Sequence, residues 1–425
     1  MPVIRPFKGL RYDPVIIGDM SRVVAPPYDI IYDEWRDRLY ERNPYNIIRL
    51  IKTREESGDN ENHNRYTRAR DYEQAWVREG ILKYDEKPAL YVRSETYGVN
   101  GMTKTRFGFI ALVKVEEFGR SIHPHERTLS APKADRLNLV KATGTNFSQI
   151  FSIFSDPDHE IQKILLEVAK GKPEADFVDE QGITRKIWIV DDKTVISRLA
   201  EKMKSRDIII ADGHHRYETS LAYKEFMEPT RRSDDEAFDY VSMYLSSGNA
   251  EGMTILPTHR KVGQLHGFDG KAFLRDMSRE FDLIPFYGAT IEEMLDRIKA
   301  DSAVTNVFGL YLKDVFYIAR MKAPAAPKLL DVDVLHDSII EKKLGITKED
   351  IAQGLYLHFS KSPEHAYEDV ARGKDQAAFF MNALTTEEMF REVLKGRRMP
   401  QKSTYFYPKT LSGLVMYKIG PESLG

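Results

Sequence analysis

Cysteine is absent from the 425 residues of the chain. Its absence excludes disulfide scaffolds, thiolate nucleophiles and zinc or iron–sulfur sites with cysteine ligands. Long apolar runs are also absent. The first residues contain no apolar segment typical of a signal peptide, and no stretch approaches the length of about 20 apolar residues that a membrane-spanning helix needs. We therefore expect a soluble, cytoplasmic protein without a membrane partner.

The chain also lacks a large net charge of either sign. Lys and Arg number 63 and Asp and Glu number 65, which gives a formal charge of -2. A chain without net positive charge is not built to coat nucleic acid, so a nucleic-acid partner is not expected, although a local basic groove is compatible with these numbers. The hydrophobic share of 42% supplies material for a core and excludes a disordered chain.

The order of apolar periods and turn residues predicts alternating strands and helices. This alternation is typical of an α/β or α+β protein with mixed sheets. The expected elements include a helix over 62–84, a hairpin that turns at 100–101, a helix over 130–143, a strand over 146–154, and a buried strand over 207–211 that leads into a helix.

Two regions follow from the distribution of polar residues. The hydrophilic stretch 229–236 is the best linker candidate in the chain. We therefore expect an N-terminal α/β region over 1–230 and a C-terminal α/β region over 237–425. The second region could form a lid, a substrate domain or a homodimer contact.

The segment from Asp212 to Arg216 carries the most chemical information. It reads Asp-Gly-His-His-Arg and lies between a buried strand and a helix. Backbone N–H groups at a helix N-terminus attract phosphate, and Arg216 adds a permanent charge with two parallel donors. His214 and His215 could bind phosphate, bind a metal or move a proton, and Asp212 could hold a divalent ion, orient a histidine or cap the helix.

A second polar cluster begins at His123 and reads His-Pro-His-Glu-Arg-Thr. His123, His125 and Glu126 could be metal ligands, or Glu126 could be a general base for a hydroxyl group. The cluster continues into the cations Lys133 and Arg136. A charged loop with internal salt bridges would explain the same residues.

Three weaker features accompany these clusters. His259 and Arg260 follow another apolar strand, Asp29 lies on a rigid Pro-Pro segment, and Lys409 closes a group of cations and hydroxyls near the C-terminus. Each of them could serve a phosphate site or be purely structural.

Six phrases of the sequence together indicate a known family. They are RPFKGLRY, VVAPPYD, HERTLSAPKADRLNL, ADGHHRYET, TILPTHR and MPQKSTYFYPK. In this order they resemble the domain-of-unknown-function family 1015 over nearly the whole chain, from Arg5 to Gly413.

The DGHHR turn also resembles the ParB/sulfiredoxin-type superfamily, in which a G-x-x-R turn at a helix N-terminus holds nucleotide phosphates. Here that turn would run from Gly213 to Arg216. Sulfiredoxins need a cysteine in this turn, so sulfinic-acid reduction is excluded. The free serine kinases of the same fold pair such a turn with a catalytic glutamate. The resemblance implies a ParB/sulfiredoxin-like nucleotide-binding core, an additional C-terminal α/β region and a link to serine metabolism.

The leading hypothesis is a phosphotransferase that moves phosphate between a nucleotide, ATP or ADP, and a small hydroxyl metabolite such as serine or phosphoserine. Glu126 would take the hydroxyl proton, with Asp29 in reserve, and Asp212 with Mg²⁺ would offset developing charge. Cofactor-binding residues would be Gly213, Arg216, Lys133, Arg136, His259 and Arg260; catalytic residues would be Glu126, Asp212, His214 and His215.

Two alternatives belong to other classes of protein. One is a ParB-like nucleotide-binding regulator associated with DNA, which would need a basic DNA-reading element. The other is a metal-dependent phosphoserine hydrolase that uses His123, His125, His214 and His215 as ligands. The candidate metal-binding residues of the site as a whole are Asp212, His123 and His125.

Overall fold

The computed structural model of the chain describes residues 1–126, 131–323 and 328–424, without the side chains of 131 and 132. The described residues form two compact units. Unit 1 comprises Met1–Thr254 and Pro408–Gly425, and unit 2 comprises Ile255–Tyr407. No helix in these ranges combines the length and the apolarity that crossing a membrane requires.

Unit 1 is built on a mixed sheet with the strand order β6-β11-β8-β12-β5-β4-β10-β9, to which β1 adds by pairing with β5. The strands are β1 (Ile4–Arg5), β4 (Leu90–Val99), β5 (Met102–Lys114), β6 (Ile122–Pro124), β8 (Ile150–Phe154), β9 (Ala175–Val178), β10 (Thr184–Val190), β11 (Ile208–Asp212) and β12 (Tyr240–Ser247). The β4–β5 hairpin turns at Asn100-Gly101, as the sequence predicts.

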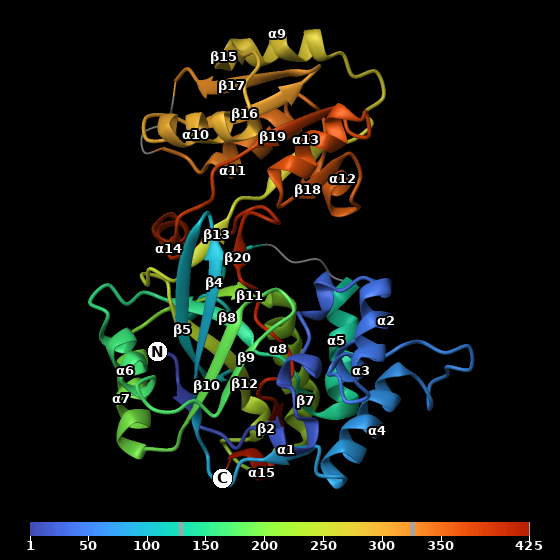
Figure 1. Ribbon diagram of the computed structural model, residues 1–425, viewed down its shortest axis with the longest axis vertical. Coiled ribbons are helices and arrows are strands. Elements are labelled where there is room, and N and C mark those ends of the chain that lie inside the picture. The colour runs from blue at the N-terminus through green and yellow to red at the C-terminus, as the bar shows by residue number, and fades with distance from the viewer. Residues whose placement is uncertain (127–130, 324–327, 425) are drawn as a thin grey trace. The chain divides into compact units, whose positions relative to one another are not determined.

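Helices cover both faces of this sheet (Figure 1). On one face, Ile161 and Leu165 of α6 and Leu199 and Met203 of α7 are buried in the same core as the central strands. The opposite side carries the remaining larger helices of the unit, of which α5 packs against both α4 and α8. The unit 1 helices are α1 (Pro14–Ile17), α2 (Asp33–Arg42), α3 (Ile48–Ile51), α4 (Arg65–Arg78), α5 (Ala131–Thr143), α6 (Glu160–Val168), α7 (Lys193–Met203), α8 (His214–Met227) and α15 (Pro421–Leu424).

Helix α4 is shorter than the periodicity over 62–84 predicts. It ends at Arg78, and Gly80 follows with a φ of +75°. Glycine adopts this left-handed conformation without the steric penalty that a Cβ brings, so it ends the helix. The last three residues of the expected helix instead form β3 (Leu82–Tyr84), which pairs with β2 (Leu10–Tyr12).

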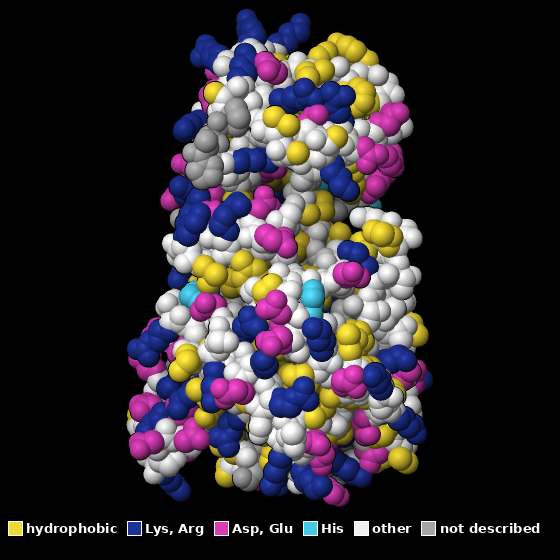
Figure 2. Space-filling view, turned by 90° about the vertical axis from the view of Figure 1, so that its left-hand side faces the viewer, with side chains coloured by type: hydrophobic (Ala, Val, Ile, Leu, Met, Phe, Trp, Pro, Cys, Tyr) yellow, Lys and Arg dark blue, Asp and Glu magenta, His cyan; other side chains and the backbone are white. Residues whose placement is uncertain are grey.

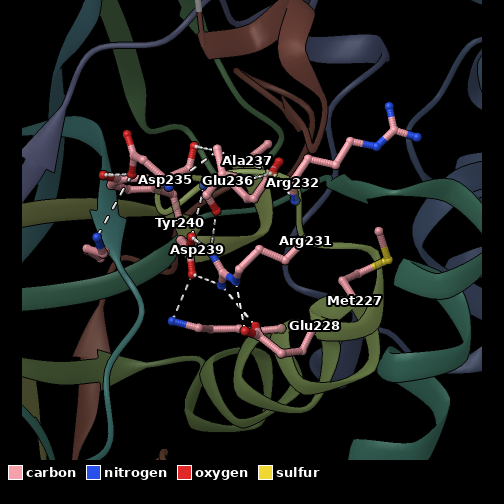
Figure 3. Close-up of polar contacts among 12 residues, drawn as sticks. Met227, Glu228, Arg231, Arg232, Asp235, Glu236, Ala237, Asp239 and Tyr240 are labelled. Atoms are coloured by element: carbon pink, nitrogen blue, oxygen red, sulfur yellow. Dashed lines mark hydrogen bonds and ion pairs between the residues drawn. The ribbon is translucent and has the colours of Figure 1, made fainter.

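The expected linker at 229–236 is an ordered turn inside unit 1. Arg231 forms ion pairs with Glu228 at 2.7 Å and with Asp239 at 2.9 Å, and Lys224 reaches the same Asp239 at 2.8 Å (Figure 3). Arg231 is therefore paired with carboxylates that flank the stretch, and Asp235 pairs with Arg5 at 2.9 Å.

The division into units accordingly differs from the expected boundary at 230–237. Strand β12 lies inside the main sheet, between β5 and β8, so unit 1 continues to Thr254. The C-terminal residues also return to unit 1, where β21 (Tyr417–Lys418) pairs with β7 (Thr145–Asn146). Pairing between segments this far apart in sequence leaves no local pattern in the composition.

Unit 2 is a second α/β body with the strand order β15-β17-β16-β19-β14-β18. Met294, Ile298, Phe316, Ala366 and Phe380 belong to its core. Its strands are β15 (Phe281–Phe286), β16 (Val307–Leu312), β17 (Val315–Met321), β14 (His259–Val262), β18 (Leu357–Ser360) and β19 (Ala377–Phe380), with β13 (Thr254–Leu256) paired to β20 (Tyr405–Tyr407). Its helices are α9 (Gly270–Glu280), α10 (Ile291–Asp301), α11 (Asp331–Val334), the π-helix at Leu335–Glu341, α12 (Lys348–Ala352), α13 (Pro363–Ala371) and α14 (Thr386–Val393). The predicted mixed α/β class is confirmed.

Candidate functional site

The strand-to-helix junction predicted around residue 212 is present in unit 1. Ile208, Ile209 and Ile210 of β11 are fully buried, and α8 begins at His214. Gly213 links the two with a φ of +100°. A Cβ at this position would lie 2.9 Å from the guanidinium group of Arg216. The junction therefore needs glycine both for its backbone conformation and for the close approach of Arg216.

The two polar clusters of the sequence meet at this edge of the sheet. Strand β6 runs parallel to β11, so the residues that follow each strand lie side by side. The backbone N–H of His125 donates to Nε2 of His214 at 3.3 Å, and the two imidazole rings are 4.7 Å apart. The ring of His125 also bonds to the carbonyl oxygen of Ile210. Residues about 90 positions apart thus form one site.

His214 is held in its neutral form. Burial of the ring, assisted by the neighbouring His125, lowers the pKa of His214 to about 3. A neutral imidazole can accept a hydrogen bond through Nε2, which matches the bond from His125. We infer that His214 orients His125 and does not supply a positive charge. His215 lies farther along α8, with Nδ1 3.9 Å from a carboxylate oxygen of Glu218.

Glu126 lies at the same edge as His214. Its Oε1 is 3.3 Å from Nε2 of His125, and its side chain is 17% exposed. The carboxylate is therefore held by a histidine and still reaches solvent. It lies near the start of α8, where its charge acts on the ring of His214.

Asp212 is enclosed by cations. Arg216 Nη2 donates to Asp212 Oδ2 at 2.7 Å, and Lys409 Nζ bonds to Oδ1. Burial alone would raise the pKa of Asp212, but Lys409 and Arg216 hold it well below its usual range. Arg216 Nη1 also bonds to the Ser148 hydroxyl at 3.2 Å and to the carbonyl oxygen of Gln149. The carboxylate is thus ionised and already neutralised by protein charges.

The structure does not assemble the predicted metal site from Asp212, His123 and His125. His123 Nε2 bonds to Asp207 at 3.0 Å, and the partners of His125 and Asp212 are those given above. In the part of the chain that the structure describes, no group of three or more His, Asp or Glu side chains has a metal-binding arrangement. Each of the three candidates is engaged by a different partner.

A pocket opens beside Arg216. The cavity itself is about 50 Å³, and about 520 Å³ is reached only when the open space at its mouth is counted. The guanidinium group of Arg136 lies 3.9 Å from the ring centre of Tyr28 and donates to the carbonyl oxygen of Ile51 at 2.8 Å. Arg216 lines the same pocket, which we call the Arg136–Arg216 pocket. Its other lining residues are the hydroxyl and amide residues Thr145, Asn146, Ser148, Thr219, Ser220 and Ser412 and the apolar residues Leu139, Val140, Phe147, Ile150 and Val241.

The other predicted cofactor-binding residues lie elsewhere. Lys133 lines a separate groove along α8 together with Glu218. His259 and Arg260 belong to β14 of unit 2, where they are 0% and 1% exposed. Arg260 donates to the carbonyl oxygen of Thr258. His259 and Arg260 are thus interior residues of unit 2, and none of these three residues lines the Arg136–Arg216 pocket.

Comparison with known proteins identifies the family. The model of the family "Protein of unknown function (DUF1015)" matches residues 4–337. The chain belongs to this family. The predicted family membership is confirmed, and a search of curated proteins gave no match.

Solved structures give more distant likenesses. A conserved hypothetical protein from Pyrococcus furiosus is 14% identical, with 67% of this chain and 87% of that chain covered and a TM-score of 0.34. A free serine kinase mutant in complex with ADP is 13% identical, with 67% and 84% covered and a TM-score of 0.35. SbnI with a C-terminal truncation, from Staphylococcus aureus, is 12% identical, with 72% and 86% covered and a TM-score of 0.34. Likenesses of this size leave the function to the residues of the site.

Proposed function

We propose that the chain is a phosphotransferase that moves phosphate between a nucleotide, ATP or ADP, and a small hydroxyl metabolite, with serine or phosphoserine as the first substrates to test. One observation carries the proposal: Arg216, in the first turn of α8, lines the Arg136–Arg216 pocket while it bonds to the carboxylate of Asp212. Two guanidinium groups and several hydroxyl groups around one pocket are donors that suit phosphate oxygens.

The residues of the site divide the work as follows. Arg216 and Arg136 would hold the phosphates. The glycine turn at Gly213 would let the phosphates approach the α8 N-terminus. Glu126 would accept the proton of the substrate hydroxyl as its oxygen bonds to the terminal phosphorus. The bond between that phosphorus and the leaving phosphate oxygen breaks, and the leaving oxygen keeps the electron pair.

Asp212 does not fit the role of a Mg²⁺ ligand. Two protein cations already neutralise its carboxylate, and a metal ion would have to displace one of them. In this proposal the charge of the transferred phosphate is offset by Arg216 and Arg136.

The alternatives gain less support from the described residues. Side chains of both signs are interspersed over the face drawn in Figure 2, which agrees with the formal charge of -2 and offers no broad basic surface for DNA. The hydrolase hypothesis requires a shared metal site, and among the described residues no group of three or more His, Asp or Glu side chains has a metal-binding arrangement. Two of its four histidine ligands, His123 and His125, bond to Asp207 and to the carbonyl oxygen of Ile210.

Nucleotide binding tests the first half of the proposal. We expect ADP or ATP to raise the melting temperature of the wild-type chain and Arg216→Met to weaken nucleotide binding about 10- to 100-fold, since a hydrogen bond to a charged group contributes about 1.5–3 kcal/mol. Arg198→Met, on the exposed side of α7, is the matched control and should bind like wild type. Equal affinity of the Arg216 and Arg198 variants would exclude the phosphate role of Arg216.

Turnover tests the second half. Glu126→Gln should keep nucleotide affinity and lower the rate of phosphate transfer to serine about 10²- to 10⁴-fold, the usual contribution of a general base. Glu167→Gln on α6 changes an exposed carboxylate of the same kind and should leave the rate unchanged. Normal turnover by Glu126→Gln would remove Glu126 from the mechanism.

A further inference from the structure

The chain returns to unit 1 at Pro408, and the residues from 408 to 418 form a return segment that reaches several parts of the unit. Ser412 pairs with Ala25, and Met416 pairs with Leu10. At its start, Lys409 places Nζ on the carboxylate of Asp212. The side chain of Lys409 is 14% exposed, so it reaches the edge of the candidate site and is still partly accessible to solvent.

A buried charge cluster lies behind the start of the return segment. Glu95 on β4 is fully buried and is surrounded by Arg93, Arg106 and Arg185, whose side chains are at most 2% exposed. Glu95 accepts bonds from Arg93 at 2.9 Å, from Arg106 at 2.7 Å and from Arg185 at 2.6 Å. The cluster lies on neighbouring strands of the main sheet, β4, β5 and β10 (Figure 1).

Two of the three arginines also hold the return segment. Arg106 Nη2 donates to the carbonyl oxygen of Pro408 at 2.7 Å, and Arg185 Nη2 donates to the carbonyl oxygen of Lys409 at 3.2 Å. These two carbonyl groups flank the Cα of Lys409. Holding both of them restricts the backbone dihedral angles of Lys409 and therefore the direction in which its side chain leaves the chain.

The third arginine makes a different set of contacts. The guanidinium group of Arg93 lies 4.6 Å from the ring centre of Tyr244, and Arg93 Nη1 is buried without a hydrogen-bond partner among the described residues. None of the hydrogen bonds that Arg93 forms within the described ranges goes to the return segment. Arg93 therefore shares the burial and the charge of the cluster but not its contact with Pro408 and Lys409.

Stability alone does not account for such a cluster. Removing several ions from water is unfavourable, and well-packed apolar side chains of similar volume are often as stabilising as a buried ion pair. What the arginines supply, and apolar side chains cannot, is a set of rigid donors that hold particular carbonyl oxygens in place.

We propose that Lys409 is a further phosphate-binding residue of the candidate site and that Arg106 and Arg185 are positioning residues that place it there. Lys409 and Arg216 bind opposite oxygens of Asp212, so the three groups form a unit with one net positive charge beside the Arg136–Arg216 pocket. The phosphate role of Lys409 rests on the proposed function. Its placement by the two arginines does not.

Chemical labelling of lysine tests the placement without any ligand. The full chain is treated with a limiting amount of an acetylating N-hydroxysuccinimide ester, and the modification rate of Lys409 is followed by peptide mass spectrometry. An amine held on a carboxylate reacts slowly, so we expect Arg106→Met and Arg185→Met to raise the rate about tenfold, as loss of one charge-assisted hydrogen bond implies. Arg93→Met should change it less than about twofold, since it removes the same charge without touching the return segment.

Exposed Lys193 on α7 serves as the internal reference, because partial unfolding would raise the rates of many lysines together. If Arg106→Met does not fold, Arg185→Lys keeps the charge of the cluster and removes the fork that reaches Lys409. Equal Lys409 rates in wild type and in the Arg185 variants, or an equal rise in Arg93→Met, would overturn the positioning role.

Binding of ADP and of inorganic phosphate tests the role of Lys409 itself. Lys409→Met should weaken binding about tenfold, and Lys409→Arg should restore most of it, because the charge is kept. Wild-type affinity in Lys409→Met would refute the phosphate role. Absence of binding to the wild-type chain would refute the proposed function and the phosphate role together, while the labelling result would still decide the placement.

Discussion

Gly213→Ala probes the close approach on which the phosphate turn depends. Gly213 has a φ of +100°, and its added Cβ would lie 2.9 Å from three atoms of the Arg216 guanidinium group. Contacts this short require a shift, and the flexible end of Arg216 is the group that would move. Moving it disturbs the bonds from Arg216 to Asp212 and to Ser148.

The magnitude has two parts. A left-handed backbone conformation destabilises a residue other than glycine by about 1–2 kcal/mol. Displacement of Arg216 weakens charge-assisted hydrogen bonds that contribute about 1.5–3 kcal/mol, some of which can re-form in a shifted position. We expect Gly213→Ala to lower the free energy of unfolding by about 2–4 kcal/mol, which corresponds to a drop in Tm of about 10 °C for a domain of this size.

Gly119 provides the matched control. It has a similar φ of +92°, and the space that its Cβ would occupy is open within 4 Å. Gly119→Ala should therefore lose only the backbone part, about 1–2 kcal/mol, and keep nucleotide affinity. Thermal unfolding and ADP titration of both variants measure the difference. If Gly213→Ala is no less stable than Gly119→Ala and binds ADP as well, then the steric link between Gly213 and Arg216 is wrong.

Two further predictions concern pH. Burial alone would raise the pKa of Glu95, but Arg106, Arg93 and Arg185 lower it to about 2, below its ordinary value of 4.5. The stability that Glu95 contributes is therefore complete above pH 4.5. About 3 kcal/mol of it is lost as the pH falls toward 2. Glu95→Gln should lower the free energy of unfolding by about 3–5 kcal/mol at pH 7 and should lose less stability than wild type in that acid range. Urea unfolding between pH 2.5 and pH 7 would measure both effects. A pH profile parallel to that of wild type would contradict the prediction. For His214, with a folded pKa of about 3, the unfolded chain takes up a proton below pH 6.5 that the folded chain does not, so His214 contributes a fall in stability of about 2 kcal/mol from pH 7 to pH 5. Burial lowers the pKa of His259 to about 4 and that of His336 to about 3, so these groups lower stability over the same range. His214→Gln should therefore fall by about 2 kcal/mol less than wild type, and an unchanged slope would show that His214 does not contribute.

Local patterns in the sequence predict the elements of the site well. The run Ile208–Ile210 predicts the buried strand, Gly213 predicts the tight turn, and the helix that follows begins where the apolar spacing places it. These features arise from neighbouring residues, because burial of an isoleucine run and the left-handed conformation of a glycine are local properties. Arg216 in the first turn follows directly from them.

The partners of these residues could not be predicted in the same way. Nothing in the sequence near Asp212 indicates that Lys409, almost 200 positions later, neutralises its carboxylate. Because Lys409 and Arg216 both bind it, Asp212 belongs to an ion-pair group and is not the expected Mg²⁺ ligand. The only available signal is the group of cations and hydroxyls near the C-terminus. The burial of Arg106 and Arg185 is harder still to predict, since arginine is usually exposed and no pattern in their strands indicates buried charges.

The residues of the chain were enough to determine the mixed α/β class, the family and the chemistry that gathers at the end of β11, because composition, periodicity and short motifs act over a few residues. Only the tertiary structure decided that β6 lies parallel to β11 and brings His125 to His214, that β12 and the return segment belong to unit 1, and that Arg260 is an interior residue of unit 2. Strand order and ion pairing between distant segments depend on which surfaces bury one another, and that is a property of the whole folded chain.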